Sequence, residues 1–277
     1  MDGARGGCGA PPAPSKMFDL LQLEAALAGT IFAGKLHFAA VTQSTNTDAL
    51  EAARGGAPHG AVYFADEQLA GRGRGGHAWH SAAGEGLYVS VLLRPAIPAV
   101  RLALLPLAAG LAAAEAIGTT SGVAIDLRWP NDLLIGPRKA GGILVEGKTE
   151  GGGVAYAVVG IGINVHQRGF AAGLATPGTS LDIEARKRTR RQALLTALLK
   201  SMQREAEALL EPAAARAIPI RVAEASTWVR GRRVAVHGPQ ACTGVTAGLD
   251  ENGFLLVETE DGVVTVQTGG LRAAEGG

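Results

Sequence analysis

Residues 71–76, GRGRGG, alternate glycine with arginine. Glycine has no Cβ, so the backbone of such a segment can come close to a ligand. The guanidinium groups of Arg72 and Arg74 suit phosphate or carboxylate oxygens. By itself the segment leaves three interpretations open: a loop that binds phosphate, an Arg-Gly segment that binds RNA, and a flexible loop without a ligand.

Two other segments offer polar groups at short spacing. QSTN, residues 43–46, carries hydroxyl and amide groups that could cap a helix beginning near Asp48 or hydrogen-bond a small polar ligand. RWPNDLLI, residues 128–135, contains a proline that must end a strand. Asn131 and Asp132 are therefore expected at an exposed turn, where such residues are also ordinary turn formers.

A fourth segment, RKAGGILVEG, places Lys139 before a glycine pair and an apolar strand. The side chain of a lysine at such a position is most often simply exposed to solvent. Together, however, the four segments supply the cations and close backbone N–H groups that an anionic nucleotide and a carboxylate substrate would need. GRGRGG follows a predicted strand but is not followed by a helix of a βαβ unit, so a dinucleotide-binding interpretation is weak. A nucleophile elbow and an H-E-x-x-H pair are absent.

The composition limits the classes of partner. The chain has 277 residues, 47% of them hydrophobic, which is enough for one large domain or a large domain with a small companion. Lys and Arg number 26 against 25 Asp and Glu, so the net charge of +1 gives little attraction to nucleic acid or an anionic membrane. The RNA-binding interpretation is weakened accordingly. Only two cysteines occur, so we expect neither a structural disulfide nor a cysteine metal site.

Targeting signals are not evident. The N-terminus lacks the apolar core of a secretory signal, and the apolar stretch from Leu102 is short for a membrane span and contains a proline and a glutamate. We therefore expect a cytoplasmic protein that makes no contact with a membrane, and a buried helix from about Leu102 to Ile117.

The remaining pattern predicts an α+β domain over residues 17–225, after a disordered tail at residues 1–16. A helix is predicted from Phe18 and another from Arg190 to Leu210, with its leucines on one face and Pro212 beyond its end. Short β-branched runs without strict βαβ alternation indicate a mixed, mostly antiparallel sheet, with strands starting at Ala61, Gly86, Ala124, Gly141 and Val154.

The sequence changes character after about Ser226. Four short apolar runs follow, separated in part by the tight turns DENG and EDG. Meandering strands of this length predict a small β-barrel domain over residues 226–277.

In order and spacing, the segments STN, EQLAGRGRGGHAW, RWPNDLLI, RKAGGILVEG and GIGINV resemble bacterial biotin–protein ligase, from about Val41 to the C-terminus. The resemblance implies a biotin/lipoate ligase-like catalytic domain followed by an SH3-like β-barrel. It also implies an ATP-dependent, AMP-forming ligase. Such an enzyme activates biotin to biotinyl-5′-AMP, with ATP and Mg²⁺ as the substrate complex. It then transfers biotin to one lysine of the biotin carboxyl carrier protein of acetyl-CoA carboxylase or a related carboxylase.

The resemblance also assigns residues to roles. Biotin would be bound by the polar segment, by the glycine-rich loop acting as a lid, and by the lysine at the reacting carboxylate and α-phosphate: Ser44, Thr45, Asn46, Gln68, Arg72, Gly73, Arg74 and Lys139. ATP or the adenylate would contact Arg72, Arg74, Trp79, Arg128, Asn131, Asp132 and Asn164. Lys139 and Arg128 would be the catalytic cations, and Asp132 would help to hold Mg²⁺.

The sequence departs from the family pattern at several positions. Arg128 stands where lysine is usual, Gly75 and His77 stand where further basic residues are common, and QTGGLRAA replaces a G-[DE]-[VI]-S-L-R pattern. Part of the contact with the triphosphate is therefore expected to be weaker or supplied elsewhere. Only 43 residues precede Ser44, so we expect a monofunctional ligase without a DNA-binding domain. A homodimer stays open.

Two other functions remain as alternatives. A lipoate or octanoate ligase or transferase of the related fold would share the lysine before a glycine-rich strand, but GRGR together with WPND argues against it. A non-catalytic biotin-sensing module would keep the pocket and lack turnover. The presence of Lys139 and of both loop arginines argues against that second alternative.

Overall fold

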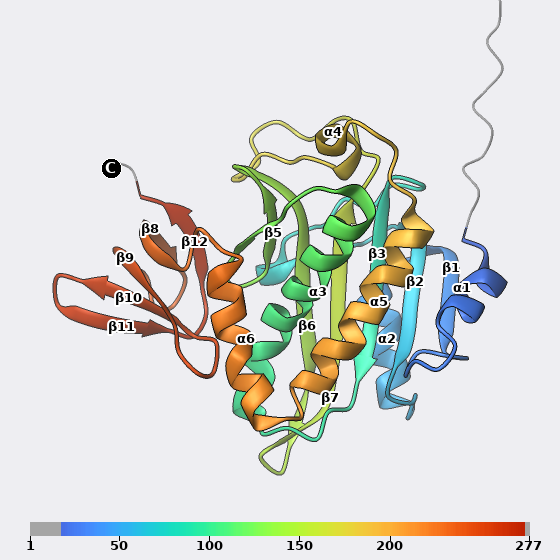
Figure 1. Cartoon of the computed structure of the whole chain (residues 1–277), viewed down its shortest axis with the longest axis horizontal. Coiled ribbons are helices and arrows are strands. Elements are labelled where there is room, and N and C mark those ends of the chain that lie inside the picture. Colours follow the sequence, from blue (N-terminus) through green and yellow to red (C-terminus); the bar gives the residue numbers. More distant parts are fainter. Residues whose placement is uncertain (1–17, 275–277) are drawn as a thin grey trace, which may run out of the picture.

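The computed structural model describes residues 18–274 and contains two β-sheets (Figure 1). The predicted disordered tail, residues 1–16, lies outside the described residues. The larger sheet has seven strands and carries helices on both faces, and the smaller sheet has five strands from the C-terminal part of the chain. This arrangement confirms the expected mixed α+β class.

The seven-stranded sheet has the order β1-β2-β3-β7-β6-β5-β4. Only β1 and β2 pair in parallel, and every other neighbouring pair is antiparallel, as predicted. The strand bounds are β1 (Leu36–Thr42), β2 (Ala61–Gln68), β3 (Gly86–Leu93), β4 (Asp126–Arg128), β5 (Asp132–Ile135), β6 (Arg138–Glu150) and β7 (Gly153–Asn164). The five predicted strands are all present, and β1 at one edge of the sheet and β5 are two strands that the sequence pattern did not indicate.

The centre of this sheet is the long pairing of β7 with β3 on one side and β6 on the other. Every residue of β3 is buried, which agrees with its largely apolar sequence between layers of helices. In the register of β7, Gly162 lies opposite Tyr88 of β3 and Gly142 of β6. Glycines therefore meet at the end of the central strands, where a ligand or a large side chain can approach the backbone.

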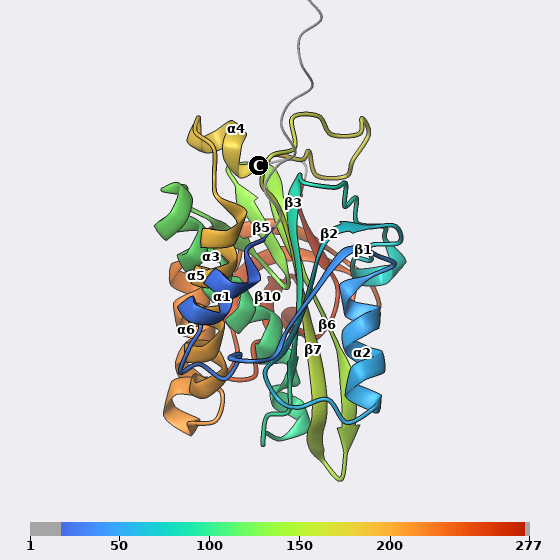
Figure 2. The ribbon, with the colours of Figure 1, turned by 90° about the vertical axis from the view of Figure 1, so that its right-hand side faces the viewer.

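Helices cover the two faces of the sheet unequally. Figure 2 shows α1 (Leu20–Ala26), α3 (Leu104–Ser121), α5 (Arg191–Ala208) and α6 (Pro212–Glu224) on one face and α2 (Thr45–Arg54) on the other. The apolar face predicted for the helix from Arg190 is confirmed, because all five of its members are buried: Leu194, Leu195, Leu198, Leu199 and Met202. Pro212 does more than follow that helix, since it occupies the first turn of α6, where its missing N–H costs nothing.

The apolar stretch from Leu102 forms the predicted buried helix. A short 3₁₀ turn, η2 (Ala99–Ala103), leads directly into α3. Helix α3 then packs against the sheet and α5. Within residues 18–274, Ala99–Ser121 alone is long and apolar enough to cross a membrane, and most of it is buried inside the fold. Hydrophobicity on all sides is typical of a helix enclosed by a core.

The C-terminal sheet has the order β11-β10-β9-β8-β12, and all its pairs are antiparallel. Its strands are β8 (Arg230–His237), β9 (Cys242–Leu249), β10 (Leu255–Thr259), β11 (Gly262–Val266) and β12 (Gly270–Ala273). The four predicted strands are present and β12 is an addition. The predicted small β-barrel is not closed: among the described strands β11 and β12 are the two edges and do not pair.

The two sheets share one continuous apolar core. Trp129, just after β4, is buried and donates its indole N–H to the carbonyl of Gly253 in the β9–β10 turn at 3.0 Å. We propose that residues 17–225 and 226–277 are two domains joined between α6 and β8. Because the two domains would share this core, the smaller domain would pack directly against the larger one.

Candidate active site

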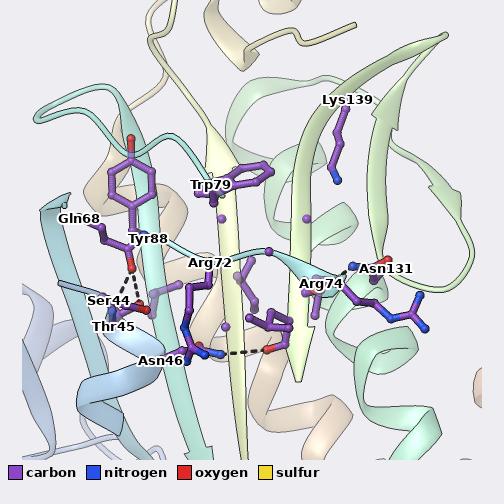
Figure 3. Close-up of a pocket in the computed structure, with 18 residues that line it drawn as sticks. Ser44, Thr45, Asn46, Gln68, Arg72, Arg74, Trp79, Tyr88, Asn131 and Lys139 are labelled. Atoms are coloured by element: carbon purple, nitrogen blue, oxygen red, sulfur yellow. Dashed lines mark hydrogen bonds between the residues drawn. The ribbon is translucent and has the colours of Figure 1, made fainter. Parts of the chain in front are cut away.

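Most of the predicted site residues line one pocket at the end of the central strands (Figure 3). Those that line it are Ser44, Thr45, Asn46, Gln68, Arg72, Gly73, Arg74, Trp79, Asn131 and Lys139. Arg128, Asp132 and Asn164 lie outside its lining. Segments separated by about a hundred residues in the sequence therefore meet at one place.

The polar end of the pocket is built on the start of α2. This helix begins at Thr45 rather than near Asp48, and the side chain of its N-cap residue, Ser44, makes no capping hydrogen bond. Thr45 and Asn46 occupy the buried first turn, where their side chains face the sheet. The helix-capping interpretation of this segment is therefore wrong for Ser44, and the buried polar groups are available to one another and to a ligand.

These polar groups form a chain of hydrogen bonds. The Oε1 atom of Gln68 accepts from the backbone N–H of Thr45 at 2.9 Å and lies 3.1 Å from the Thr45 hydroxyl. The hydroxyls of Thr45 and Ser90 are 2.8 Å apart, and Ser90 donates to Oδ1 of Asn46 at 2.6 Å. Because Thr45, Asn46 and Ser90 are buried, Gln68 is half-buried, and each of them has a partner, the orientations of the side-chain amides are fixed before a ligand arrives.

The glycine-rich loop is a tight hairpin rather than an extended flexible segment. The N–H of Gly73 bonds to the carbonyl of His77 at 2.6 Å, and the N–H of Trp79 bonds to the carbonyl of Gly71 at 2.8 Å. Gly75 has φ of 68°, a conformation that favours glycine, within the turn η1 (Arg74–Gly76). The turn itself thus requires glycine, in addition to any need for a ligand to approach the loop backbone closely.

The two arginines of the loop point to opposite sides. Arg72 forms two hydrogen bonds with Glu146 of β6, at 2.9 and 3.2 Å. Arg74 reaches the C-terminal sheet, where it donates to the Thr268 hydroxyl at 2.5 Å and to the carbonyl of Gly269. Burial lowers the pKa of Arg74, and nearby Asp132 acts in the opposite direction. A poorly solvated guanidinium of this kind gains from the arrival of an anion.

A second group of charges surrounds Asp132. Its Oδ1 atom is 2.5 Å from Nζ of Lys139, and its Oδ2 atom accepts from Arg128 at 2.6 and 3.0 Å. Arg128 also donates to the hydroxyl of Thr176 at 2.8 Å and lies 5.1 Å from the ring centroid of Trp228. One carboxylate therefore positions two cations, and Lys139 is the one that reaches the pocket.

The turn between β4 and β5 is less exposed than the sequence predicted. Asn131 and Asp132 are both half-buried, and Asp132 is already the first residue of β5. Asn131 donates its side-chain amide to the carbonyl of Ile143 on β6 at 2.7 Å. Hydrogen bonds and ion pairs to neighbouring elements, rather than solvent, satisfy the polar groups of this turn.

Trp79 lies across the glycines of the central strands. A Cβ at Gly162 would stand 2.6 Å from the indole nitrogen, so the ring can occupy this place only because Gly162 has no side chain. The indole N–H is buried without a partner in the described part of the chain, and Nζ of Lys139 is 5.6 Å from the ring centroid. Trp79 thus forms a wall of the pocket beside the lysine.

Asn164 lies next to the pocket but outside its lining. Its side-chain amide donates to the carbonyl of Thr179 at 3.0 Å and to the carbonyl of Lys139 at 3.4 Å. These hydrogen bonds hold the backbone at Lys139 in place from outside the pocket. The predicted contact of Asn164 with adenine stays a prediction, and the position of Asn164 indicates a supporting role.

Sequence reasoning missed three polar residues at the site. Tyr88 lines the pocket and Ser90 is fully buried beneath it, both on β3. Glu146 lies on β6 within the apolar run that follows Lys139. Each is a polar residue in an apolar strand, and that anomaly was the available signal. Burial, with a smaller contribution from Glu85, raises the pKa of Tyr88, so its phenol stays protonated.

The site offers a divalent cation few ligands of its own. Within residues 18–274 no group of three His, Cys, Asp or Glu side chains is close enough to hold a metal. Asp132 is the acidic group nearest Lys139, and both its oxygens already contact cations. The pocket is therefore suited to an anionic ligand with a polar head group, and a metal would have to be held largely by that ligand.

Comparison with known proteins gives a consistent result. A family model described as the biotin/lipoate A/B protein ligase family matches residues 38–164. A bifunctional ligase/repressor BirA from Bacillus spizizenii is 34% identical over 231 residues, 80% of this chain and 69% of that protein. A biotin–[acetyl-CoA-carboxylase] ligase from Mycobacterium tuberculosis is 31% identical over 242 residues, 85% of this chain and 87% of that protein.

A solved structure is similar over nearly the same span. The biotin protein ligase from Aquifex aeolicus in complex with biotin and ATP matches with a TM-score of 0.75 and 29% sequence identity. The match covers 87% of this chain and 100% of that chain.

Proposed function

The chain belongs to the biotin/lipoate A/B protein ligase family, and we propose that it is a biotin–protein ligase. It would use ATP to activate biotin as biotinyl-5′-AMP. It would then transfer the biotinyl group to a lysine of a biotin carboxyl carrier protein. The observation that carries this proposal is the meeting of a fixed polar end and a cationic end in one pocket.

The two ends of the pocket suit the two ends of biotin. Figure 3 shows Ser44, Thr45, Asn46 and Gln68 on one side and Lys139 on another, with Trp79 between them. The polar end would hydrogen-bond the ureido ring, whose polar atoms need partners when buried. The biotin carboxylate would then lie toward Lys139 and the loop arginines.

The first chemical step joins two anions. A biotin carboxylate oxygen attacks the α-phosphorus of ATP, an acyl–phosphate bond forms, and the bond to the β-phosphate oxygen breaks to release pyrophosphate. Lys139 would offset the negative charge where the two groups meet, and Asp132 would hold its ammonium group in place at 2.5 Å. Arg128, on the other oxygen of Asp132, would face the phosphates from outside the pocket lining.

Mg²⁺ would enter with ATP and neutralise phosphate charge, with Asp132 as the protein group nearest to it. The adenylate would be bound by Arg72, Gly73, Arg74, Trp79 and Asn131, with Asn164 supporting the backbone of the pocket lysine. In the second step the neutral amine of a carrier lysine attacks the acyl carbon. AMP leaves with the electrons of the acyl–phosphate bond, and an amide forms.

Several wider properties belong to the same proposal. The carrier protein of acetyl-CoA carboxylase or of a related carboxylase is the acceptor we expect. A cytoplasmic location would bring the enzyme together with ATP and that acceptor.

The test is transfer to a purified biotin carboxyl carrier domain. With ATP, Mg²⁺ and biotin, mass spectrometry should show one biotinyl group per carrier domain, and none should appear without ATP or with the acceptor lysine replaced. Labelling with lipoate or octanoate in place of biotin would instead assign the protein to the lipoate branch of the family. Binding of biotin without labelling of the carrier domain would instead support the alternative function, a non-catalytic biotin-sensing module.

A further inference from the structure

Glu146 touches the pocket without lining it. The residue lies on β6, where it pairs with Val158 of β7, and its side chain is 28% exposed. One of its oxygens accepts from the amide of Asn46 at 2.9 Å and from Arg72 at 2.9 Å. The other accepts from Arg72 at 3.2 Å. One carboxylate therefore joins the polar end of the pocket to the glycine-rich loop.

The orientation of Asn46 depends on this carboxylate. Ser90 donates to the amide oxygen of Asn46, whereas Glu146 accepts from its amide nitrogen. A donor on one side and an anionic acceptor on the other leave a single arrangement of the amide. Gly160 leaves room for it, because a Cβ at that position would overlap Oδ1 of Asn46.

The hydrogen bonds form a path that starts and ends at the loop. From Arg72 the path runs through Glu146, Asn46, Ser90, Thr45 and Gln68 to Ser81. Ser81 in turn bonds to the carbonyl of Trp79 at the end of the hairpin, at 3.1 Å. Both sides of the loop are thus hydrogen-bonded, directly or through neighbours, to the polar side chains that would bind the polar end of the ligand.

We propose that Glu146 is a positioning residue that couples recognition of the ligand's polar end to closure of the lid, residues 71–79. With Asn46 in its single orientation, the carboxylate holds Arg72 across the pocket and the lid stays over the bound acyl-adenylate. This inference rests on the proposed function for the identity of that ligand. Retention of the adenylate, rather than the chemistry that forms it, depends on Glu146.

The substitution that separates these roles is Glu146→Gln. Glutamine keeps an oxygen that can accept from Asn46, but its amide group is a donor facing the donors of Arg72. Glu150→Gln is the matched control, because Glu150 is on the same strand, its side chain is 70% exposed, and its carboxylate forms an ion pair with Lys148 at 3.4 Å, away from Asn46 and Arg72. Release of radiolabelled biotinyl-adenylate, formed on the enzyme from biotin and ATP, is followed during a chase with unlabelled biotin.

Release should be about tenfold faster in Glu146→Gln, because a charge-assisted hydrogen bond pair is lost. The first-turnover rate of pyrophosphate formation should stay within about threefold of wild type. Glu150→Gln should match wild type in both. In an Arg72→Met background the Glu146 substitution should add nothing to the release rate, since the two residues act through one contact. An unchanged release rate in Glu146→Gln, or a full additional increase in that background, would overturn the inference.

A second measurement does not need turnover. In the ligand-free protein, hydrogen exchange at residues 71–79 should be faster in Glu146→Gln than in wild type and in Glu150→Gln. Equal exchange in all three proteins would overturn the inference even if no adenylate were made. Failure of wild type to form an adenylate from biotin would instead refute the proposed function, and it is seen before any variant is tested.

Discussion

Replacing Lys139 by alanine should abolish the chemistry and spare the fold. The ammonium group contacts Asp132 at 2.5 Å, and the side chain is 30% exposed. Its removal leaves Asp132 paired with Arg128 at 2.6 Å, so no carboxylate is stranded. The backbone of residue 139 keeps its bonds to Pro177 and Thr179 whatever the side chain. For a partly exposed ion pair whose carboxylate keeps another partner, the free energy of unfolding should fall by no more than about 1 kcal/mol.

The effect on catalysis should be much larger. A preorganised cation at the point where charge develops typically contributes about 10²–10³-fold in rate, or about 3–4 kcal/mol of transition-state stabilisation. The first-turnover rate of pyrophosphate formation should fall by that factor in Lys139→Ala, with the melting temperature nearly unchanged. Lys148→Ala is the matched control, because Lys148 lies on the same strand with a side chain that is 56% exposed. A rate within about tenfold of wild type, in a folded Lys139→Ala protein, would refute the assigned role.

Three other substitutions or conditions probe the site and its frame. Gly160→Ala should displace Asn46, because the new methyl group would overlap its amide, and biotin affinity measured by calorimetry should fall about tenfold or more. Arg74→Ala should free the lid from the β11–β12 loop and speed hydrogen exchange at residues 71–79, and unchanged exchange would contradict the contact. Burial lowers the pKa of His59 and of His166 from 6.5, so the stability they contribute is present above that pH and is lost as pH falls below it. The melting temperature should therefore drop between about pH 7 and pH 5, less steeply in His166→Asn, and an equal slope in that variant would rule out its contribution.

The sequence was most informative where local pattern determines structure. β2 and β3 begin at the predicted residues, and β7 begins one residue before the predicted position. The motif residues were identified by their types and order, and the fold brings ten of them to one pocket. Their predicted roles in binding and catalysis remain predictions that the experiments above address.

Features that depend on distant pairing could not be predicted. β1 has a half-exposed, mixed pattern, and its parallel partner β2 lies beyond a helix. β12 is only four residues long and starts with glycine, so its sequence carries little strand signal, and its pairing with β8 leaves the C-terminal sheet open. Glu146 is a single carboxylate in an apolar strand, and its importance comes from Arg72 and Asn46, which are remote in sequence.

The most direct test of the proposed function is acid-dependent release of pyrophosphate from ATP and Mg²⁺. Biotin, lipoate and octanoate are supplied separately to the wild-type protein, and the burst of pyrophosphate is measured in the absence of an acceptor. A biotin-specific burst of about one equivalent, with biotinyl-5′-AMP retained on the enzyme, is the predicted result. A burst with lipoate or octanoate alone, or biotin binding without any pyrophosphate, would contradict it.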